Sequence, residues 1–254
     1  MQQFPMVSVI IPAYNEEKYI IKTLSAVLQQ DYPNYEVIVV NNASTDATER
    51  LVNEFIQTLP ATGPQIIFCT EEKQGTNYAR ECARKLATGK IIAQLDADCV
   101  PGKHWVSNGV KLLSGSAVAA TGPYDYFDAP IYMRAFTFLS QYLTYPIVST
   151  IVQVANRGGI LIGGNAFVKA KVLELAGGYN TAFTFYGDDV DIAAKVSSLG
   201  WIRFSSTLLL PSSSRRYKAI GFWKVIKKYQ DCFWNVVFRK DTNPFDTLEM
   251  NHPR

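Results

Sequence analysis

Residues 90–98 read Lys90-Ile91-Ile92-Ala93-Gln94-Leu95-Asp96-Ala97-Asp98, an apolar run that ends in two aspartates. The β-branched content and the start just after Gly89 predict a buried strand, in which residues two apart point the same way. Asp96 and Asp98 would then project into one small space. Two carboxylates that close repel each other unless a cation or hydrogen-bond donors neutralise them, which favours a divalent metal site. The simpler alternative is a turn after a strand.

The chain before this stretch alternates between predicted strands and helices. Strands are predicted at 7–11, 37–40, 66–69 and 90–95. Between them we expect helices from Asn15, acting as a cap, to Gln30, from Asp46, also a cap, to about Thr58, and from about Thr76 to Ala87. This alternation predicts an α/β fold with a mostly parallel central sheet, helices on both faces and ligands at the carboxyl ends of the strands.

The composition limits the classes of function. With 254 residues, 48% hydrophobic and 19% charged, the chain can form one extended α/β domain or two joined halves. A net charge of +3 is too small to indicate a nucleic-acid partner. The four cysteines have no CxxC spacing and only two histidines accompany them. We therefore expect no structural zinc site or disulfide framework, and a reduced, intracellular protein without a signal peptide.

Motifs of several other enzyme classes are missing from the sequence. GxGxxG, GxSxG and HExxH do not occur, and the spacing from Gly159 to Gly164 is followed by Asn165 where a P-loop needs lysine. A phosphatase with an Asp-x-Asp nucleophile would carry its first aspartate directly after the first strand. The residues there are Pro12-Ala13-Tyr14-Asn15-Glu16.

Six short motifs together resemble a known family. They are Pro12-Ala13-Tyr14-Asn15-Glu16, Val40-Asn41-Asn42-Ala43-Ser44-Thr45-Asp46, Asp96-Ala97-Asp98, Gly163-Gly164-Asn165, Gly177-Gly178-Tyr179 and Gly187-Asp188-Asp189-Val190-Asp191. Each motif is weak alone, but their order and separations are similar to those of family-two glycosyltransferases, over roughly residues 7–205. The resemblance implies the A-type glycosyltransferase fold (GT-A), a nucleotide-diphosphate sugar donor, with a UDP-sugar favoured, and inversion at the anomeric carbon.

The resemblance also implies an organisation and an acceptor. We expect a single glycosyltransferase domain over 1–254, with a nucleotide-sugar-binding half at 1–100, an acceptor and catalytic half at 101–210, and a basic, aromatic segment at 211–254. The acceptor would be a hydroxyl group on a glycan, on a lipid-linked molecule or on a precursor of a cell-surface glycan. A hexosyl or N-acetylhexosaminyl group would be transferred.

The resemblance assigns donor-site roles to several residues. Asp98 would bind a divalent cation, Mn²⁺ or Mg²⁺, which stabilises the charge that grows on the leaving diphosphate. Asp96 would support the metal or lie near the ribose. The nucleoside pocket would be lined by Pro12, Tyr14, Glu16 and Asn42.

Some of these residues have ordinary structural interpretations. Glu16 and Asp46 also suit the first turn or cap of a helix, where acidic side chains are favoured. Tyr14 could be a packed aromatic residue. Arg80 matches an arginine that the family places near the donor, and a solvated helix face is the alternative.

An inverting transfer needs a base that takes the proton of the acceptor hydroxyl. Asp188, Asp189 and Asp191 crowd one short segment, and repulsion with burial should raise at least one pKa toward a useful range. The resemblance assigns the base to Asp189, while Asp188 would bind the acceptor or orient its neighbour. The alternative is that the three acids cap a helix at 192–199.

The sequence departs from the family pattern in three ways. Asn41-Asn42 stands where many relatives have paired aspartates, which leaves the choice of base open because an amide both accepts and donates. The segment 210–216 lacks the histidine that often completes the metal site. Arg215 and Arg216 could supply charge on the diphosphate instead, or form a solvated basic turn. A QxxRW-like motif is missing, so transfer of a single sugar is favoured over polymer synthesis.

Two stretches bear on contact with a membrane. The uncharged run 135–154 is more typical of helices lining the acceptor side than of a membrane span. Residues 220–238 predict a basic, aromatic amphipathic helix, either packed on the protein or in peripheral contact with a membrane. We expect a cytoplasmic protein, which would lie at the inner face of the membrane if this helix contacts it. The alternative function, suggested by Asn41-Asn42 and the missing histidine, is a non-catalytic nucleotide-binding homologue that acts as an accessory subunit.

Overall fold

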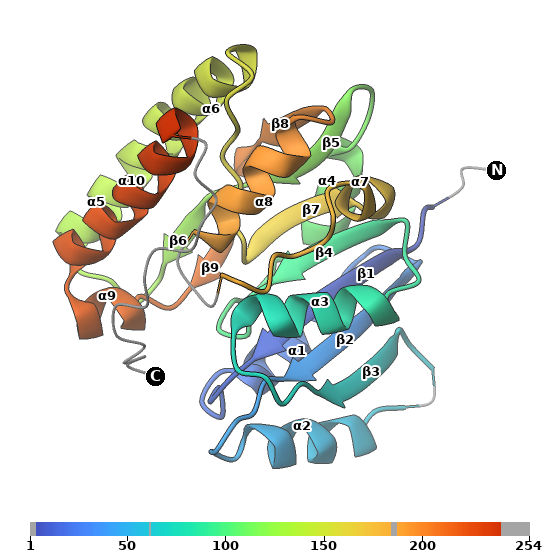
Figure 1. Ribbon diagram of the computed structural model, residues 1–254. Helices are drawn as coiled ribbons and strands as arrows, with labels where there is room; N and C mark the ends of the chain where they lie inside the picture. Colours follow the sequence, from blue (N-terminus) through green and yellow to red (C-terminus); the bar gives the residue numbers. More distant parts are fainter. Residues whose placement is uncertain (1–3, 61, 184–186, 240–254) are drawn as a thin grey trace.

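The computed structural model describes residues 4–60, 62–183 and 187–239. In this part of the chain, seven strands form one sheet in the order β3-β2-β1-β4-β7-β5-β8 (Figure 1). The strands are β1 (Val7–Ala13), β2 (Tyr35–Asn41), β3 (Gln65–Thr70), β4 (Ile91–Leu95), β5 (Ala117–Thr121), β7 (Asn165–Lys169) and β8 (Trp201–Phe204). The first four pair in parallel, β5 pairs in parallel with β8, and β7 is antiparallel to both of its neighbours. The predicted mostly parallel sheet is confirmed.

Helices cover both faces of the sheet because successive strand residues point to opposite sides. Val9 and Ile11 of β1 belong to one core, which is covered by α1 (Ile20–Val27), α2 (Thr48–Gln57) and α4 (Trp105–Leu112). Ile10, which lies between them, belongs to the other core, covered by α3 (Thr76–Leu86), α7 (Ala170–Leu175) and α8 (Asp188–Ser197). The sheet is therefore buried on both sides.

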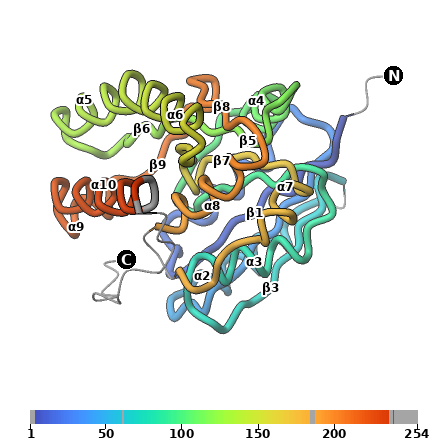
Figure 2. Tube along the Cα trace, turned by 45° about the horizontal axis from the view of Figure 1, so that its top comes forward, coloured from blue at the N-terminus to red at the C-terminus, as the bar shows by residue number. Residues whose placement is uncertain are grey.

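A second, smaller part of the structure lies at the carboxyl end of the sheet. Strands β6 (Tyr124–Tyr126) and β9 (Leu210–Ser212) pair in parallel, and a short 3-10 helix (Ser206–Leu208) precedes β9. The helical part comprises α5 (Ile131–Leu139), a π-helical turn (Ser140–Thr144), α6 (Tyr145–Val154), α9 (Arg215–Ile220) and α10 (Phe222–Arg239). Figures 1 and 2 show α5, α6 and α10 together at one side of the molecule. The Phe136 and Phe222 rings pack edge to face with their centroids 5.4 Å apart, which joins α5 to α10.

The prediction of a helix capped by Asn15 was wrong at its start. The helix begins at Ile20, because Asn15 has a left-handed backbone with φ of 53° and its side-chain oxygen accepts a hydrogen bond from the Thr45 amide at 2.8 Å. The second helix begins at Thr48, and the Asp46 carboxylate accepts a hydrogen bond from the Thr48 amide at 2.9 Å. Asp46 therefore stabilises the start of α2 by accepting the hydrogen bond of its first amide, although Asp46 lies two residues before the helix.

The two stretches considered for membrane contact are helical. Residues 135–154 fall within the nearly continuous run of α5, the π turn and α6. In the described part of the chain, no helix combines the length and apolar character needed to cross a membrane. The helix predicted at 220–238 corresponds to α10, whose residues Phe222 and Val225 are buried. The end of the predicted segment 211–254, from 240 onward, lies outside the described residues.

Candidate active site

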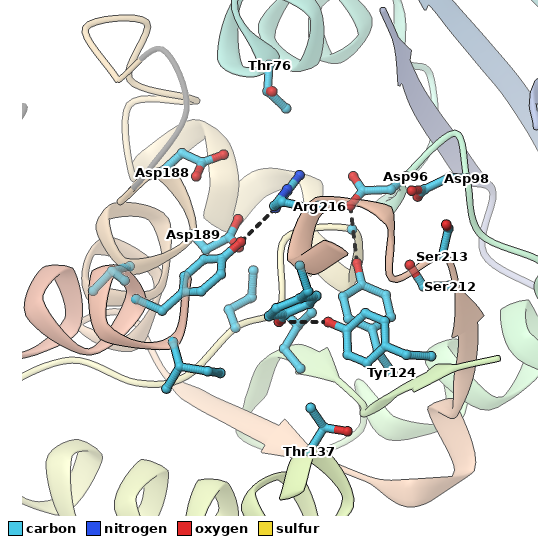
Figure 3. A pocket seen from close by; sticks show the side chains of 18 of the residues that line it. Thr76, Asp96, Asp98, Tyr124, Thr137, Asp188, Asp189, Ser212, Ser213 and Arg216 are labelled. Atoms are coloured by element: carbon cyan, nitrogen blue, oxygen red, sulfur yellow. Dashed lines mark hydrogen bonds between the residues drawn. The ribbon is translucent and has the colours of Figure 1, made fainter. Parts of the chain in front are cut away.

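One cavity of about 360 Å³ lies beyond the carboxyl ends of β1, β2 and β4, between the sheet and the helices α5, α6, α9 and α10. Its lining includes every residue predicted for the site: Pro12, Tyr14, Glu16, Asn42, Arg80, Asp96, Asp98, Asp188, Asp189, Arg215 and Arg216. Figure 3 shows Asp188 and Asp189 on one side of this cavity and Asp96 and Asp98 on the other, with Arg216 between them. Residues far apart in sequence are thus brought to one place.

Asp96 and Asp98 follow β4 directly, and their side chains are 33% and 15% exposed. The Tyr124 hydroxyl, contributed by β6, donates a hydrogen bond to Asp96 at 3.3 Å. Gly164 makes room for Asp96, because a Cβ atom at this glycine would lie 2.1 Å from the Asp96 carboxylate. The predicted Gly163-Gly164 motif therefore has a steric reason.

Arg215 lies against the same carboxylates. Its guanidinium forms an ion pair with Glu16 and another with Asp98, at 3.2 Å, and stacks over the Tyr19 ring with its carbon 4.8 Å from the ring centroid. Glu16 lies four residues before α1, so its carboxylate serves this ion pair rather than the helix start. Arg215 is therefore not part of a solvated basic turn, because its side chain is paired with two carboxylates in the cavity.

Arg80 is buried at the centre of the acidic groups, with 4% of its side chain exposed. Its guanidinium nitrogens lie 2.8 Å from Asp188, 3.4 Å from Asp96 and 3.5 Å from Asp189. The interpretation of Arg80 as part of a solvated helix face is therefore wrong. Arg80 joins the two acidic sides of the cavity, which keeps three carboxylates compatible with one small volume.

Asp188 and Asp189 lie in the first turn of α8, which begins at Asp188 rather than at 192. Burial, and then repulsion from Asp189, raises the pKa of Asp188 to about 7, although Arg80 opposes this shift. Burial also raises the pKa of Asp189, with Arg80 again acting in the opposite direction. Gly163 makes room for Asp189, because a Cβ atom at Gly163 would lie 1.8 Å from Asp189 Oδ1.

The third acid of this motif has a different environment. The Asp191 carboxylate is 1% exposed and pairs with Lys195 at 2.7 Å, one turn further along α8. Asp191 does not line the cavity. Asp191 thus forms an ion pair within α8 and does not cap the helix, while Asp188 and Asp189 face the cavity.

Asn42 holds the loop that precedes α3. Its amide donates hydrogen bonds to the carbonyl oxygens of Glu71 at 3.0 Å and Lys73 at 2.7 Å, and its oxygen accepts one from the Gly75 amide at 2.8 Å. Both amide hydrogens are used, so the side chain can offer a ligand only the second lone pair of its oxygen.

Several cavity residues were not predicted from the sequence. Tyr124, Ser212 and Ser213 line the cavity because β6 and β9 pair with each other and Ser212 bridges to Cys99. This pairing also carries Arg215 and Arg216 to the aspartates. The Tyr-Asp-Tyr alternation at 124–126 was the local signal for a strand, but nothing local indicates its partner 86 residues later.

Asp96 and Asp98 have the chemistry of a hard-cation site. Among the described residues, no group of three or more His, Cys, Asp or Glu side chains is placed to hold a metal ion. Two carboxylates beside a substrate diphosphate are nevertheless a normal protein contribution for Mg²⁺, which keeps several water ligands. The residues present therefore fit a cation shared with a bound diphosphate.

The family model for glycosyl transferase family 2 matches residues 8–175. The chain belongs to this family, as its motifs and its sheet indicate.

Particular relatives agree with this assignment. Glycosyltransferase AglE of Haloferax volcanii is 34% identical over 186 residues, which cover 72% of this chain and 59% of the relative. The chain thus spans less than two thirds of that protein's length. The solved mannosyltransferase PcManGT of Pyrobaculum calidifontis, in complex with GDP-Man and Mn²⁺, superposes with a TM-score of 0.70 and 25% identity over 95% of this chain and 72% of that one.

A more distant structure shares the fold. S. aureus TarS 1–349 in complex with UDP-GlcNAc has a TM-score of 0.61 and 18% identity, covering 83% of this chain and 59% of that chain. The expected GT-A fold is confirmed.

Proposed function

We propose that the protein is an inverting glycosyltransferase that moves one sugar from a nucleotide-diphosphate donor to an acceptor hydroxyl. The observation that carries this proposal is the single cavity with Asp96 and Asp98 on one side and Asp189 on the other. The donor would lie along residues 1–100 and the acceptor along 101–210, with Arg215 and Arg216 from the C-terminal segment closing the site.

The reaction assigns a separate task to each side of the cavity. The acceptor oxygen forms a bond to the anomeric carbon, and the bond from that carbon to the diphosphate oxygen breaks, so the electron pair leaves with the nucleoside diphosphate. Asp189 takes the hydroxyl proton. Asp188 orients the acceptor or Asp189. A direct displacement of this kind inverts the anomeric configuration.

The leaving diphosphate needs positive charge around it. A divalent cation, Mn²⁺ or Mg²⁺, bound by Asp98 with support from Asp96 would supply charge neutralisation there. Arg215 already forms ion pairs with Glu16 and Asp98, and Arg216 lies near the centre of the cavity (Figure 3). These arginines would add positive charge beside the diphosphate, although they cannot bind the metal as the family's histidine does. The Mn²⁺ and GDP-Man bound in PcManGT support a metal and a hexosyl donor.

The hydrogen bonds of Asn42 favour some nucleotide bases. Because the loop 71–75 uses both amide hydrogens, Asn42 behaves toward a ligand as an acceptor, as an aspartate would. A ring N–H, as in uracil, thymine or guanine, complements an acceptor, whereas N3 of cytosine does not. UDP-sugars remain the favoured donors, and CDP-sugars are disfavoured.

Peripheral contact with a membrane is a further part of the proposal. Large apolar side chains are exposed on α5, the π turn, α6 and α10, namely Ile131, Tyr132, Phe138, Leu139, Leu143, Ile147, Ile151, Val154, Trp223, Trp234 and Phe238. Lys224 and Lys227 are exposed on α10. Lysines beside an apolar surface suit the anionic cytoplasmic face of a membrane, which is the location we propose.

Thermal melting with UDP, GDP, CDP and dTDP, each with Mn²⁺, Mg²⁺ or EDTA, tests the donor site. A nucleotide at a hundredfold over its Kd adds about 2.7 kcal/mol of stability, which raises the midpoint by on the order of 5–10 °C. We expect a metal-dependent shift with UDP and none with CDP, and Asp98→Ala should reduce the shift. A protein that melts unchanged with all four nucleotides would contradict the proposal. Binding without any transfer would favour the accessory-subunit alternative.

A further inference from the structure

The wall of the catalytic cavity changes character between its two ends. Toward β1, β4 and α8 it is charged. Toward α6 and α10 it is formed by the aromatic and aliphatic side chains of Tyr145, Val148, Ile160, Ile226, Phe233 and Trp234. Among the described residues, the lining contributed by α5, the π turn, α6 and α10 includes no Asp, Glu, Lys or Arg. We call this part of the cavity the apolar sector.

Hydroxyl groups also belong to the wall of the cavity. Thr137, Ser140 and Thr144 line the cavity along α5 and the π turn. Gln141 in the same turn is engaged with the backbone of Tyr124, accepting from its amide at 2.7 Å and donating to its carbonyl at 3.0 Å. These hydroxyls can hydrogen-bond a sugar head, Thr137 as an acceptor because its own proton is donated to the Met133 carbonyl oxygen at 2.9 Å.

The apolar sector reaches the molecular surface. Trp234 lines it and is also 44% exposed. The outer faces of the same helices carry Ile147, Ile151 and Trp223, which are 59%, 60% and 63% exposed. Lys224 and Lys227 are exposed beside them on α10. An apolar channel that opens among apolar and basic side chains fits a molecule that enters from a lipid surface.

We propose that the apolar sector binds the hydrocarbon chain of a lipid-linked acceptor. The chain lies between α6 and α10, the polar head lies along the hydroxyls of α5 and the π turn, and the hydroxyl to be glycosylated lies beside Asp189. This inference rests on the proposed function and names the acceptor class of the same site. Of the glycan and lipid-linked acceptors expected from the sequence, the lipid-linked class is the one that this sector fits.

Binding of n-alkyl β-D-glucosides from butyl to decyl, each below its critical micelle concentration, tests this inference by calorimetry. Each methylene that enters an apolar site should raise the affinity by about fourfold, until the sector is filled. Val148→Phe fills part of the sector and should lower the affinity for decyl glucoside by about 16-fold, the value of two methylenes. Ile147→Phe, at the neighbouring exposed position, is the matched control and should leave it unchanged.

The outcomes separate this inference from the proposed function. An affinity that does not depend on chain length would overturn it. So would binding that Ile147→Ser weakens and Val148→Phe does not, because the chain would then lie on the outer face of α6. The melting shift with UDP and Mn²⁺ reports the donor site independently. A normal shift without chain-length dependence would reject the apolar sector as the lipid site while leaving the glycosyltransferase proposal intact.

Discussion

At Gly163, one added methyl group would collide with the proposed base, since a Cβ atom there lies 1.8 Å from Asp189 Oδ1. We expect Gly163→Ala to displace Asp189 and lower the rate of transfer by about 100-fold or more. Gly102→Ala is the matched control, because nothing lies within 4 Å of a Cβ atom at that position. Product formation by the two variants checks this. If Gly163→Ala and Gly102→Ala transferred sugar at similar rates, the position of the Asp189 carboxylate would not matter for catalysis.

Asp189→Asn removes the proton acceptor and keeps the shape of the side chain. Transfer should fall by about 10²–10⁴-fold, the usual contribution of a general base, while the nucleotide-induced melting shift is retained. Asp191→Asn, in the same turn of α8 but outside the cavity, should keep most of the activity. Loss of nucleotide binding in Asp189→Asn would show that this residue serves the donor instead.

At the residue scale, the motifs were sufficient to name side chains that gather in one cavity, but not their partners. Asp98 and Asp189 carry local signals, namely a strand end and a helix start. The burial of Arg80 among three carboxylates depends on α3, β4 and α8 meeting, which no local pattern records. Tyr124 was missed for the same reason. The two hydrogen bonds that Asn42 donates to the loop 71–75 were likewise not predictable, because they depend on where that loop lies in the folded chain.

At the scale of elements, α2 depends on a carboxylate outside the helix. Partial burial raises the pKa of Asp46, but hydrogen bonds from Thr48 and Glu17 outweigh it, so the pKa lies below the ordinary value of 3.8. A lowered pKa means that the stabilisation is present above the unfolded-state value and is lost as the pH falls through the folded-state value.

Asp46→Ala should therefore lower the free energy of unfolding by about 1 kcal/mol at pH 7. The difference from the wild type should shrink toward pH 3, which urea unfolding at the two pH values measures. Glu54→Ala removes an exposed ion pair on the same helix and should cost no more than about 0.5 kcal/mol. An equal difference at both pH values would exclude a role for the ionised Asp46.

Strands β5 to β9 were not predicted, whereas the helices and strands of residues 7–95 were, because apolar periodicity reports burial. Their ends were not. Asparagine is a common residue at helix N-caps, yet the Asn15 side-chain oxygen accepts a hydrogen bond from the Thr45 amide. The acids at 188–191 belong to the first turn of α8, where the macrodipole favours them. At Asn15 a tertiary contact overrides a local preference, whereas the acids of α8 follow theirs and only the first residue of the helix was misplaced.

At the scale of the whole molecule, the exposed apolar helices predict binding to membranes. The protein should co-sediment with vesicles that contain phosphatidylglycerol at low salt, and less at high salt. Ile151→Ser should weaken this binding, whereas Leu175→Ser should not, although the two side chains are 60% and 65% exposed. Leu175 ends α7, away from α5, α6 and α10 (Figure 1). Protein that stays entirely in the supernatant at low salt would rule out the contact.

The arrangement of the sheet could be predicted only in part. Strands joined by single helices were expected to pair in parallel, and the first four do so. The insertion of β7 between β4 and β5 was not expected. No strand was predicted at 165–169, and the direction and neighbours of β7 are set by long-range packing.

The place of β7 also has a consequence for synthesis of the chain. When residues up to 121 have been made, β4 and β5 exist, but the strand that lies between them begins only at Asn165. During that interval the inner edge of β4 has unpaired backbone groups that another nascent chain could join. A chain truncated before β7 should therefore aggregate through the edge of β4, and chaperone dependence should be greatest while these residues emerge from the ribosome.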